Sequence, residues 1–384
     1  MSGIYLHIPF CKQACSYCNF HFATSLKKKN ALLSALKKEL RLRKEAFANE
    51  TVSTIYFGGG TPSLLTFDEL QKLLDEVYKN YRVATAPEIT LEANPDDLNA
   101  EKIKQLARSS FNRLSIGIQS FFDTDLKLMH RSHTANTARA CLEEATTYFK
   151  NLSIDLIYGI PGMTHARWQQ NIATALLYKV PHVSAYALTV EPRTALAVSI
   201  KKGTVPPLDD ALAQQHFFTL TAHLAANDFV HYEVSNFGRK RFFSRHNTSY
   251  WQGKPYLGIG PSAHSFNGRQ RSWNIANNSK YIAALTADTL ALTVETLSKT
   301  DRYNEYIMTG LRTIWGVSLT KIARDFGTYY KTYVLSQAEK YMTEGLLFLD
   351  SPTGQSEADV LKTTKKGKFF SDGIASDLFL LNLR

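Results

Sequence analysis

Short apolar runs alternate with longer amphipathic stretches over the first half of the chain. Runs rich in β-branched residues indicate buried strands, whereas apolar residues spaced three or four positions apart indicate helices. The pattern predicts strands at 4–8, 53–57, 88–93, 113–118, 152–157 and 182–188, separated by helices near 26–48, 67–79, 99–109, 134–149 and 164–178. Six strand–helix units in a row favour an α/β fold with a parallel sheet, either doubly wound or barrel-like.

The second half departs from this alternation. The stretch KKGTVPPLDD at 201–210 marks a domain shoulder before a helix near 211–226, and an aromatic, glycine-rich region follows at 229–273. The end of the chain predicts helices near 302–313, 318–326 and 328–344, Gly345 as a helix C-cap, a strand LLFLD and a polar tail with Lys362, Lys365, Lys366 and Lys368. We therefore expect three parts: 1–228, a connecting region 229–298, and a C-terminal α+β domain 299–384.

Composition changes this picture little. Of the 384 residues, 44% are hydrophobic and 21% charged, and no segment approaches the roughly 18 uncharged apolar residues of a transmembrane helix. The N-terminal sequence MSGIYLHIPF has neither a basic leader nor a long apolar run, so we expect no secretory signal and a cytoplasmic location. The formal net charge of +11 suggests an anionic partner without identifying it.

Three of the four cysteines, Cys11, Cys15 and Cys18, lie within eight residues, directly after the first predicted strand. This spacing suits one compact metal centre in a reducing compartment better than a disulfide framework. A four-iron cluster held by three cysteines leaves one iron open to a small molecule. Zinc is the alternative, because His21 completes a Cys3His set. Cys141 is interpreted as a small apolar residue on a helix.

Glycine and polar residues follow several of the predicted strands. In YFGGGTP, Gly59, Gly60 and Thr61 let the backbone approach a ligand closely, although a tight turn would have the same sequence. Four polar residues lie at or near the ends of further strands, or one helix later: Glu92, Gln119, Asp155 and Arg131. Each alone is typical of an exposed or capping residue. Because these four residues would lie together at the carboxyl ends of barrel strands, they predict a ligand pocket there.

The run YLHIPFCKQACSYCNF at 5–20 resembles the cluster signature of radical S-adenosylmethionine (SAM) proteins, in the branch that holds the oxygen-independent coproporphyrinogen III oxidases (HemN) and the heme chaperones (HemW). The similarity covers most of the chain. It implies a partial (β/α)6 barrel with a C-terminal accessory domain, a [4Fe-4S] cluster on the three cysteines, and SAM chelating the open iron. It also implies that the SAM pocket is lined by Tyr5, Tyr17, Gly59, Gly60, Thr61, Glu92, Gln119, Arg131, Asp155 and Ala187.

Two departures separate the chain from the oxidases of this branch. The oxidases carry a further cysteine two positions after the third, where this chain has Phe20, and a long N-terminal extension, whereas ten residues precede Cys11. The run RHNTSYW at 245–251 matches the HNxxYW motif of the chaperones, which implies His246 as a heme ligand, with nearby arginines and lysines on the propionates. The alternative is that His246 is a hydrogen-bonded residue in a turn.

The resemblance implies a function in porphyrin metabolism. The expected role is to bind heme and pass it to an acceptor protein, for which a membrane-associated respiratory protein is a candidate, with an electron donor for the cluster. The enzyme alternative is a coproporphyrinogen oxidase or another porphyrin-directed radical SAM reaction. The C-terminal helices also allow a winged-helix arrangement, with Gly316 in the turn and Lys331 on the recognition helix. Basic segments such as 27–44 are typical of solvated faces, so we expect no nucleic-acid partner.

Overall fold

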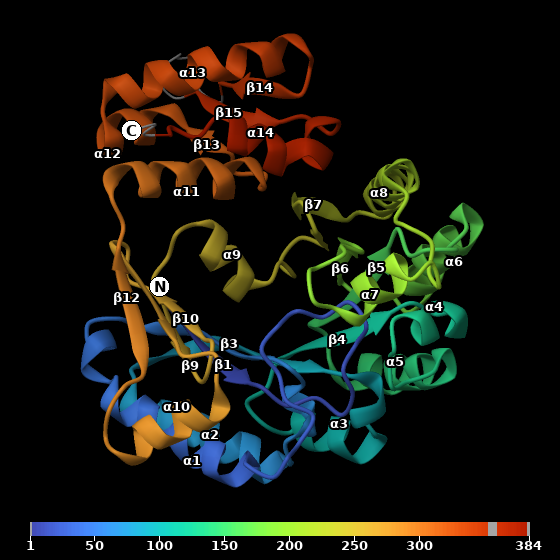
Figure 1. Ribbon diagram of the computed structural model, residues 1–384, viewed down its shortest axis with the longest axis vertical. Coiled ribbons are helices and arrows are strands. Elements are labelled where there is room, and N and C mark those ends of the chain that lie inside the picture. Colours follow the sequence, from blue (N-terminus) through green and yellow to red (C-terminus); the bar gives the residue numbers. More distant parts are fainter. Residues whose placement is uncertain (1, 352–358, 382–384) are drawn as a thin grey trace.

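The structure, a computed structural model, describes residues 2–351 and 359–381. Its largest element is a 12-stranded sheet in the order β12-β11-β10-β9-β1-β2-β3-β4-β5-β6-β8-β7 (Figure 1). A second sheet of three strands, β13-β15-β14, lies in the C-terminal part of the chain. Each sheet has its own cluster of buried apolar side chains.

The first six strands of the large sheet are those predicted from the sequence: β1 (Ser2–Ile8), β2 (Val52–Gly59), β3 (Val83–Ala93), β4 (Arg113–Gln119), β5 (Leu152–Tyr158) and β6 (His182–Ala187). They pair in parallel and in sequence order. A doubly wound sheet would reverse its order at one point, whereas this one does not. The expected α/β partial barrel is confirmed.

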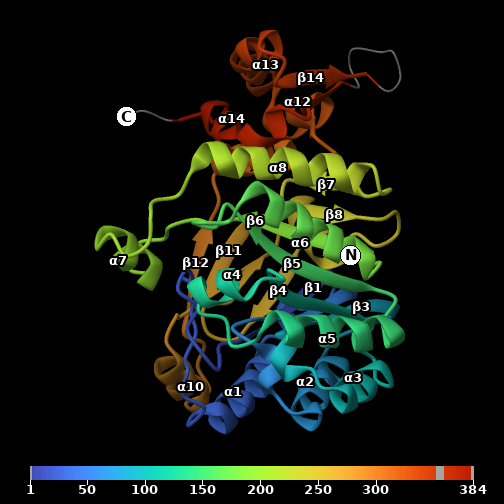
Figure 2. The ribbon, with the colours of Figure 1, turned by 90° about the vertical axis from the view of Figure 1, so that its right-hand side faces the viewer.

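Helices cover the outer side of this sheet, as Figures 1 and 2 show: α1 (Lys29–Leu42), α2 (Phe67–Asn80), α3 (Ala100–Ala107), α4 (Asp123–Leu128), α5 (Ala135–Tyr148) and α6 (His165–Leu177). The first helix buries leucines on one of its faces, from Leu32 to Leu40. This helix is shorter than predicted because a separate 3₁₀ turn, Glu45–Phe47, follows it. Helices α7 (Ala195–Lys201) and α8 (Asp210–Ala225) come after β6.

The region between the barrel and the C-terminal part supplies strands to both edges of the parallel sheet. Strands β7 (Val230–Glu233) and β8 (Asn236–Gly238) extend the edge at β6. After α9 (Arg245–Trp251), strand β9 (Tyr256–Ile259) pairs in parallel with β1 at the opposite edge. An antiparallel ribbon continues from it through β10 (His264–Phe266), β11 (Gln270–Asn274) and, after α10 (Asn278–Thr286), β12 (Leu292–Thr296).

A buried carboxylate holds the glycine-rich loop that follows β9. Glu39 of α1 accepts hydrogen bonds from the Gly260 amide (2.8 Å), the Asn274 amide side chain (2.7 Å) and the Tyr281 hydroxyl (2.6 Å). A Cβ at Gly258 would lie only 2.0 Å from the His264 carbonyl oxygen, so this position requires glycine. The GIGPSAHSF segment, which has no predicted role, therefore anchors the ribbon to the barrel.

The C-terminal part has the element order of a winged helix: α11 (Lys299–Leu311), β13 (Val317–Ser318), α12 (Leu319–Phe326), α13 (Thr328–Thr343), β14 (Leu347–Asp350) and β15 (Val360–Thr363). Gly345 has φ +69° just after α13, as its predicted C-cap role requires. A last helix, α14 (Ser371–Asp377), follows.

The prediction of a polar tail after residue 350 is wrong for Lys362 and Lys368, whereas Lys365 and Lys366 are exposed. Lys362 lies in β15, and Lys368 is buried in a 3₁₀ turn, Gly367–Phe370. The Lys368 ammonium donates to the His231 carbonyl oxygen, and burial lowers the pKa of Lys368 to about 8. Charged residues in this segment thus attach the C-terminal part to the barrel, which the lysine-rich sequence could not indicate.

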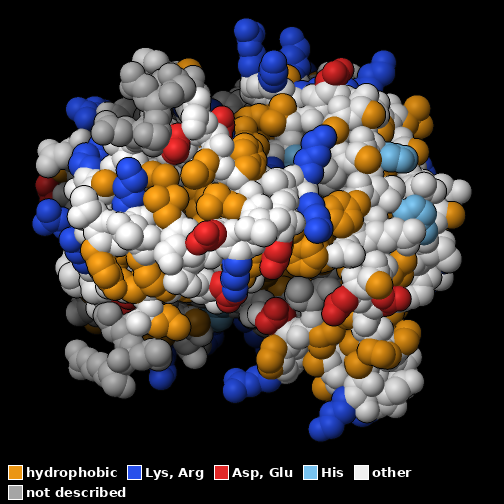
Figure 3. All heavy atoms as spheres, turned by 90° about the horizontal axis from the view of Figure 1, so that it is seen from above, with side chains coloured by type: hydrophobic (Ala, Val, Ile, Leu, Met, Phe, Trp, Pro, Cys, Tyr) orange, Lys and Arg blue, Asp and Glu red, His pale blue; other side chains and the backbone are white. Residues whose placement is uncertain are grey.

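Hydrophobic and charged side chains are interspersed on the face to which the C-terminal part contributes. Seen from above, Lys and Arg are scattered among apolar groups and form no continuous stripe on this face (Figure 3). Tyr329 of α13 and Phe348 of β14 are among the exposed large side chains. The winged-helix order alone therefore assigns no ligand to this face. Across the described residues, no helix combines the length and apolarity needed to cross a bilayer.

Candidate functional site

The three clustered cysteines line one pocket of about 160 Å³ at the carboxyl ends of the barrel strands. Their loop runs between β1 and α1 and is held at the Ser16 amide, which donates to the Met129 carbonyl oxygen (3.1 Å). Burial raises the pKa of the Cys11 thiol to about 11 and also raises that of Cys18. Thiols in such surroundings become thiolates when a metal centre supplies the positive charge.

The glycine turn after β2 lies directly against this loop. A Cβ at Gly60 would lie 2.7 Å from the Phe10 carbonyl oxygen and 3.0 Å from the Cys11 sulfur. Gly59 has φ +110°, a conformation that favours glycine, and its amide donates to Glu92 (3.2 Å). The glycines are therefore required by the close approach of two chain segments.

The polar residues predicted at the strand ends converge on the same pocket. Glu92, Gln119 and Asp155 come from β3, β4 and β5 and all line it. Burial raises the pKa of Glu92 to about 7 and that of Asp155 to about 6. Glu92 also accepts a hydrogen bond from the Tyr56 hydroxyl (2.7 Å). A cationic ligand group in this pocket would lower the pKa of both carboxyl groups and favour their charged form.

Arg131 links the cysteine loop to the strand ends. Its guanidinium donates to the Asn94 side chain (2.6 Å), the Gly117 carbonyl oxygen (3.0 Å) and the Cys15 sulfur (3.3 Å). Its Nε is buried and has no hydrogen-bond partner within the described parts of the chain. A buried donor without a partner is costly, so this nitrogen is suited to an anionic group of a ligand.

Two residues implied by the resemblance do not line this pocket. Tyr5 is placed behind it, where its ring stacks on Tyr56 (6.0 Å between centroids) and its hydroxyl bonds His7 Nδ1 (3.1 Å). Ala187 pairs with Tyr158 at the end of β6 and stands outside the lining. Tyr17, Gly59, Gly60 and Thr61 do line the pocket.

Sequence reasoning missed Asn94. This side chain donates to the Thr61 hydroxyl (3.3 Å) and accepts from Arg131, so it joins the glycine turn to the guanidinium. Its position two residues after Glu92, directly before a proline that ends β3, is the signal that could have found it.

The residues present fit a group held by three cysteines better than a Cys3His zinc ion. The lining includes Cys11, Cys15 and Cys18 but not His21. The His21 imidazole instead donates through Nε2 to Asn278 of α10 (2.7 Å) and stacks on His7. The glycine cradle, the unpaired Arg131 nitrogen and the buried carboxyl groups add places for a zwitterionic ligand beside such a group.

The position of His246 disagrees with its expected role as a heme ligand. His246 is buried in α9, with Nδ1 bonded to the Thr54 hydroxyl (2.8 Å) and Nε2 to the Tyr250 hydroxyl (2.7 Å). Burial lowers the pKa of its imidazole to about 3, so the ring is neutral. Both ring nitrogens have partners here, so binding an iron atom through either one would require breaking a buried hydrogen bond. The alternative of a hydrogen-bonded histidine describes this position.

Comparisons with known proteins agree with this architecture. Residues 5–175 match the family model of the radical SAM superfamily, and residues 297–352 match that of the HemN C-terminal domain. The solved structure of coproporphyrinogen III oxidase (HemN) from Escherichia coli, described as a radical SAM enzyme, has a TM-score of 0.83. It is 22% identical and covers 98% of this chain and 90% of its own, so the two share the fold.

Relatives of similar length have higher identity. The chain is 33% identical over 382 residues to the heme chaperone HemW of Mycobacterium tuberculosis, covering 98% of this chain and 94% of the relative. It is 34% identical to the heme chaperone HemW of Lactococcus lactis, with 91% of both chains covered. With the barrel, the cysteine pocket and the winged-helix part in place, these similarities show that the chain belongs to the HemW family of radical SAM proteins.

Proposed function

We propose that this protein is a heme chaperone, which binds heme and passes it to an acceptor protein, and that it carries one [4Fe-4S] cluster and SAM. The observation that carries the proposal is the convergence of the cysteine loop, the glycine turn and the polar strand ends on one pocket. The similar relatives described as heme chaperones support the heme part of the proposal.

In this proposal Cys11, Cys15 and Cys18 hold three irons of the cluster. The Arg131 guanidinium donates to the Cys15 sulfur (3.3 Å) and so orients this side chain. When bound, the cluster and SAM supply one-electron chemistry. The protein's own contribution is a loop held at fixed distances from β2 and from Arg131.

SAM would bind beside the cysteines because its charged groups match the lining. Its amino group would face the Gly59–Gly60–Thr61 turn, as the family resemblance implies, and the unpaired Nε of Arg131 would suit its carboxylate. Glu92 and Asp155 supply negative charge for its sulfonium and hydrogen bonds for its ribose, with Gln119 at the next strand end. Tyr5 lies behind the pocket and packs against Tyr56, which in turn donates to Glu92.

The proposal places the protein in the cytoplasm, since thiolate ligands persist in a reducing compartment. It also requires an electron donor for the cluster and a heme acceptor, for which a membrane-associated respiratory protein is a candidate. A chaperone must release its cargo, so the acceptor must take heme from the loaded protein.

Anaerobic purification followed by iron, acid-labile sulfide and heme analysis tests the proposal. We expect iron and sulfide in equal amounts, one heme bound on titration, and transfer of heme to the apo form of a heme protein. On the same sample, coproporphyrinogen decarboxylation without heme binding would establish the oxidase alternative instead. Stoichiometric zinc without sulfide would overturn the cluster.

A second test concerns SAM. Saturating SAM is expected to change the electron paramagnetic resonance spectrum of the reduced cluster, and Asp155→Ala to weaken this response. Loss of one charge-assisted contact reduces affinity by about tenfold to a hundredfold. An unchanged spectrum in the wild type would remove SAM from the proposal.

A further inference from the structure

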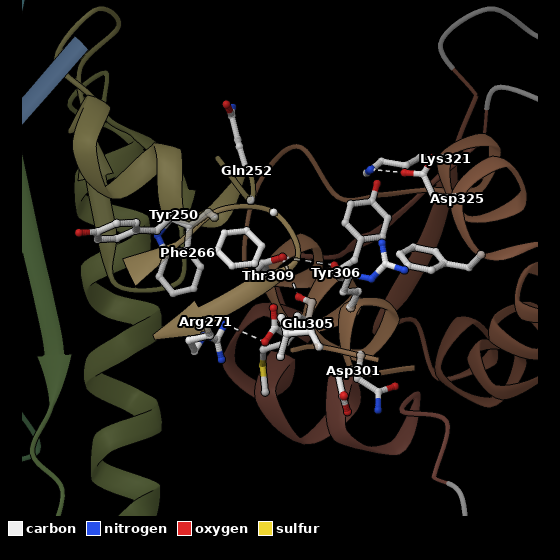
Figure 4. A pocket seen from close by; sticks show the side chains of 18 of the residues that line it. Tyr250, Gln252, Phe266, Arg271, Asp301, Glu305, Tyr306, Thr309, Lys321 and Asp325 are labelled. Atoms are coloured by element: carbon white, nitrogen blue, oxygen red, sulfur yellow. Dashed lines mark hydrogen bonds and ion pairs between the residues drawn. The ribbon is translucent and has the colours of Figure 1, made fainter. Parts of the chain in front are cut away.

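A second cavity lies between the barrel side and the C-terminal part. Its volume of about 780 Å³ falls within the range of small-molecule sites, roughly 300–1,000 Å³. One wall is formed by the end of α9 and the β9–β12 ribbon, and the other by α11 and α12 (Figure 4). The HNxxYW segment therefore reaches this cavity through Tyr250 and Trp251, while His246 does not line it.

Aromatic and apolar side chains face this space from both walls. Tyr256 and Phe266 come from the ribbon, and Tyr306 and Phe326 from α11 and α12. Figure 4 shows Phe266 on the ribbon side and Tyr306 on the helix side of the opening. Two aromatic walls with a gap between them suit a flat, apolar ligand.

The aromatic wall at α9 is held in place from behind. The Trp251 ring lies under the Arg312 guanidinium, 5.1 Å from it, and Arg312 pairs with the buried Glu233 carboxylate (2.9 Å). The Tyr250 ring packs edge-on against Tyr256 at 4.4 Å between centroids. The wall is thus preorganised, so little side-chain freedom is lost when a ligand binds.

Three cationic side chains line the same cavity. Arg271 of β11 pairs with Glu305 of α11 (2.7 Å), and Lys321 pairs with Asp325. The Nε of Arg302 is buried and lacks a hydrogen-bond partner among the described residues. The cavity therefore offers one unsatisfied guanidinium nitrogen and two further cations that can exchange their partner for a ligand carboxylate.

We propose that this cavity is the heme site: the macrocycle lies between the Tyr256–Phe266 and Tyr306–Phe326 walls, with its propionates at Arg302 and Arg271. Heme combines a flat apolar body with two carboxylates on one edge, which this lining matches. The cluster pocket, at about 160 Å³, is much smaller than this cavity. This inference rests on the proposed function and moves the heme contact from His246 to the cavity that Tyr250 and Trp251 reach.

Because the walls hold the macrocycle, iron is not required for binding. Protoporphyrin IX without metal is expected to bind the same cavity and to compete with heme. This outcome distinguishes a cavity site from a site defined by one iron ligand, since a ligand-defined site would not retain the metal-free ring.

The experiment introduces a bulky side chain into the cavity by substitution. Thr309 lines it on α11, and its hydroxyl donates to the Glu305 carbonyl oxygen one turn earlier (2.8 Å). Thr343 on α13 makes the same backbone contact, to Glu339 (3.0 Å), but is exposed and does not line the cavity. Thr309→Trp and Thr343→Trp therefore add the same bulk to matched helical positions, and anaerobic titrations with heme and with protoporphyrin IX compare them.

We expect Thr309→Trp to weaken both ligands by at least about tenfold while iron and sulfide stay at wild-type levels, and Thr343→Trp to bind as the wild type does. Wild-type affinity in Thr309→Trp would overturn the cavity site and leave the proposed function standing. Absence of heme binding by the wild type would overturn both.

A second variant covers the case in which Thr309→Trp does not fold. Arg302→Gln leaves the aromatic walls in place and removes the guanidinium charge. Its affinity for heme is expected to be about fivefold or more lower than that of the wild type. Its affinity for a porphyrin with esterified propionates is expected to equal that of the wild type. Equal heme affinity in Arg302→Gln and the wild type would contradict the assignment of the propionates.

Discussion

The cluster pocket and the cavity beside the C-terminal part are built in different ways. The cluster pocket takes its residues from loops and strand ends of successive βα units, each marked by a short motif such as the cysteine run or the glycine turn. The cavity takes its residues from the ribbon and the C-terminal helices, and most of them are ordinary aromatic and charged residues. A polar site at a barrel mouth is therefore visible in the sequence, whereas a site made by docking two layers is not.

The largest expected effect comes from replacing a cysteine that lines the cluster pocket. Cys15→Ser should remove iron and sulfide completely, because in the proposed function each of the three cysteines is a cluster ligand. Cys141→Ser is the matched control, since Cys141 is buried on α5 and remote from the pocket. Colorimetric iron and sulfide analysis measures the effect, and a full cluster in Cys15→Ser would refute the ligand set.

The next effect concerns His246, which lies between the two sites. His246→Ala removes two buried hydrogen bonds and the ring that stacks on Tyr56 at 4.9 Å, so we expect the free energy of unfolding to fall by about 2–4 kcal/mol. Heme affinity should also fall because α9 loses its support, while iron and sulfide remain. Denaturant titration and heme titration measure these changes, with His223→Ala on α8 as the control.

A direct iron ligand would give another result for the same residue. If His246 bound iron, His246→Ala would change the absorption spectrum of bound heme and leave metal-free protoporphyrin unaffected. We expect both ligands to weaken together.

The sequence predicted the barrel more completely than the second cavity, for physical reasons. The strands of the parallel sheet are local apolar runs, and Glu92 and Asp155 lie on them, so their convergence follows from the fold class alone. Strand β9 was missed because its partner β1 lies at the opposite end of the barrel segment, and the short run Tyr256–Ile259 has no signal of its own.

The same limit applies to single residues. A lysine in a charged stretch is usually solvated, which predicts a polar tail at Lys368, yet docking onto the barrel buries this side chain. His246 was expected at heme because its motif resembles that of the chaperones. Its hydrogen bonds to Thr54 and Tyr250 depend on where α9 packs, which the sequence does not encode locally.

A smaller effect tests the electrostatics of the cluster pocket through pH. The pKa of Glu92 is raised from 4.5 to about 7 in the folded protein by burial, so between these values the folded state holds a proton that the unfolded state has lost. Stability of the cluster-free protein should therefore fall as pH rises from 5 to 8, on the order of 2 kcal/mol from this group.

Glu92→Gln isolates that contribution. The variant should lose less stability than the wild type over the same pH range, in urea titrations at each pH. Glu101→Gln, at an exposed position of α3, serves as the control. Parallel pH profiles for Glu92→Gln and the wild type would show that the carboxyl group is ionised throughout and would contradict its buried, proton-holding environment.

The smallest expected effect is on heme binding in the cavity, where one substitution should raise the affinity instead of lowering it. Glu305 pairs with Arg271 across the cavity, and burial raises the pKa of its carboxyl group. Glu305→Gln should free Arg271 for a propionate and tighten heme binding about threefold, because a half-buried ion pair contributes roughly 1 kcal/mol or less. Heme titration at constant ionic strength measures this, and weaker binding would contradict the role of Arg271.

One measurement tests the separation of the two sites most directly: the ratios of heme and of acid-labile sulfide to protein, determined together on anaerobically prepared wild type, Cys15→Ser and Thr309→Trp loaded with one equivalent of heme. We predict that Cys15→Ser loses sulfide and keeps heme, whereas Thr309→Trp keeps sulfide and loses heme. Loss of both groups in either variant, with the fold intact by circular dichroism, would contradict the account.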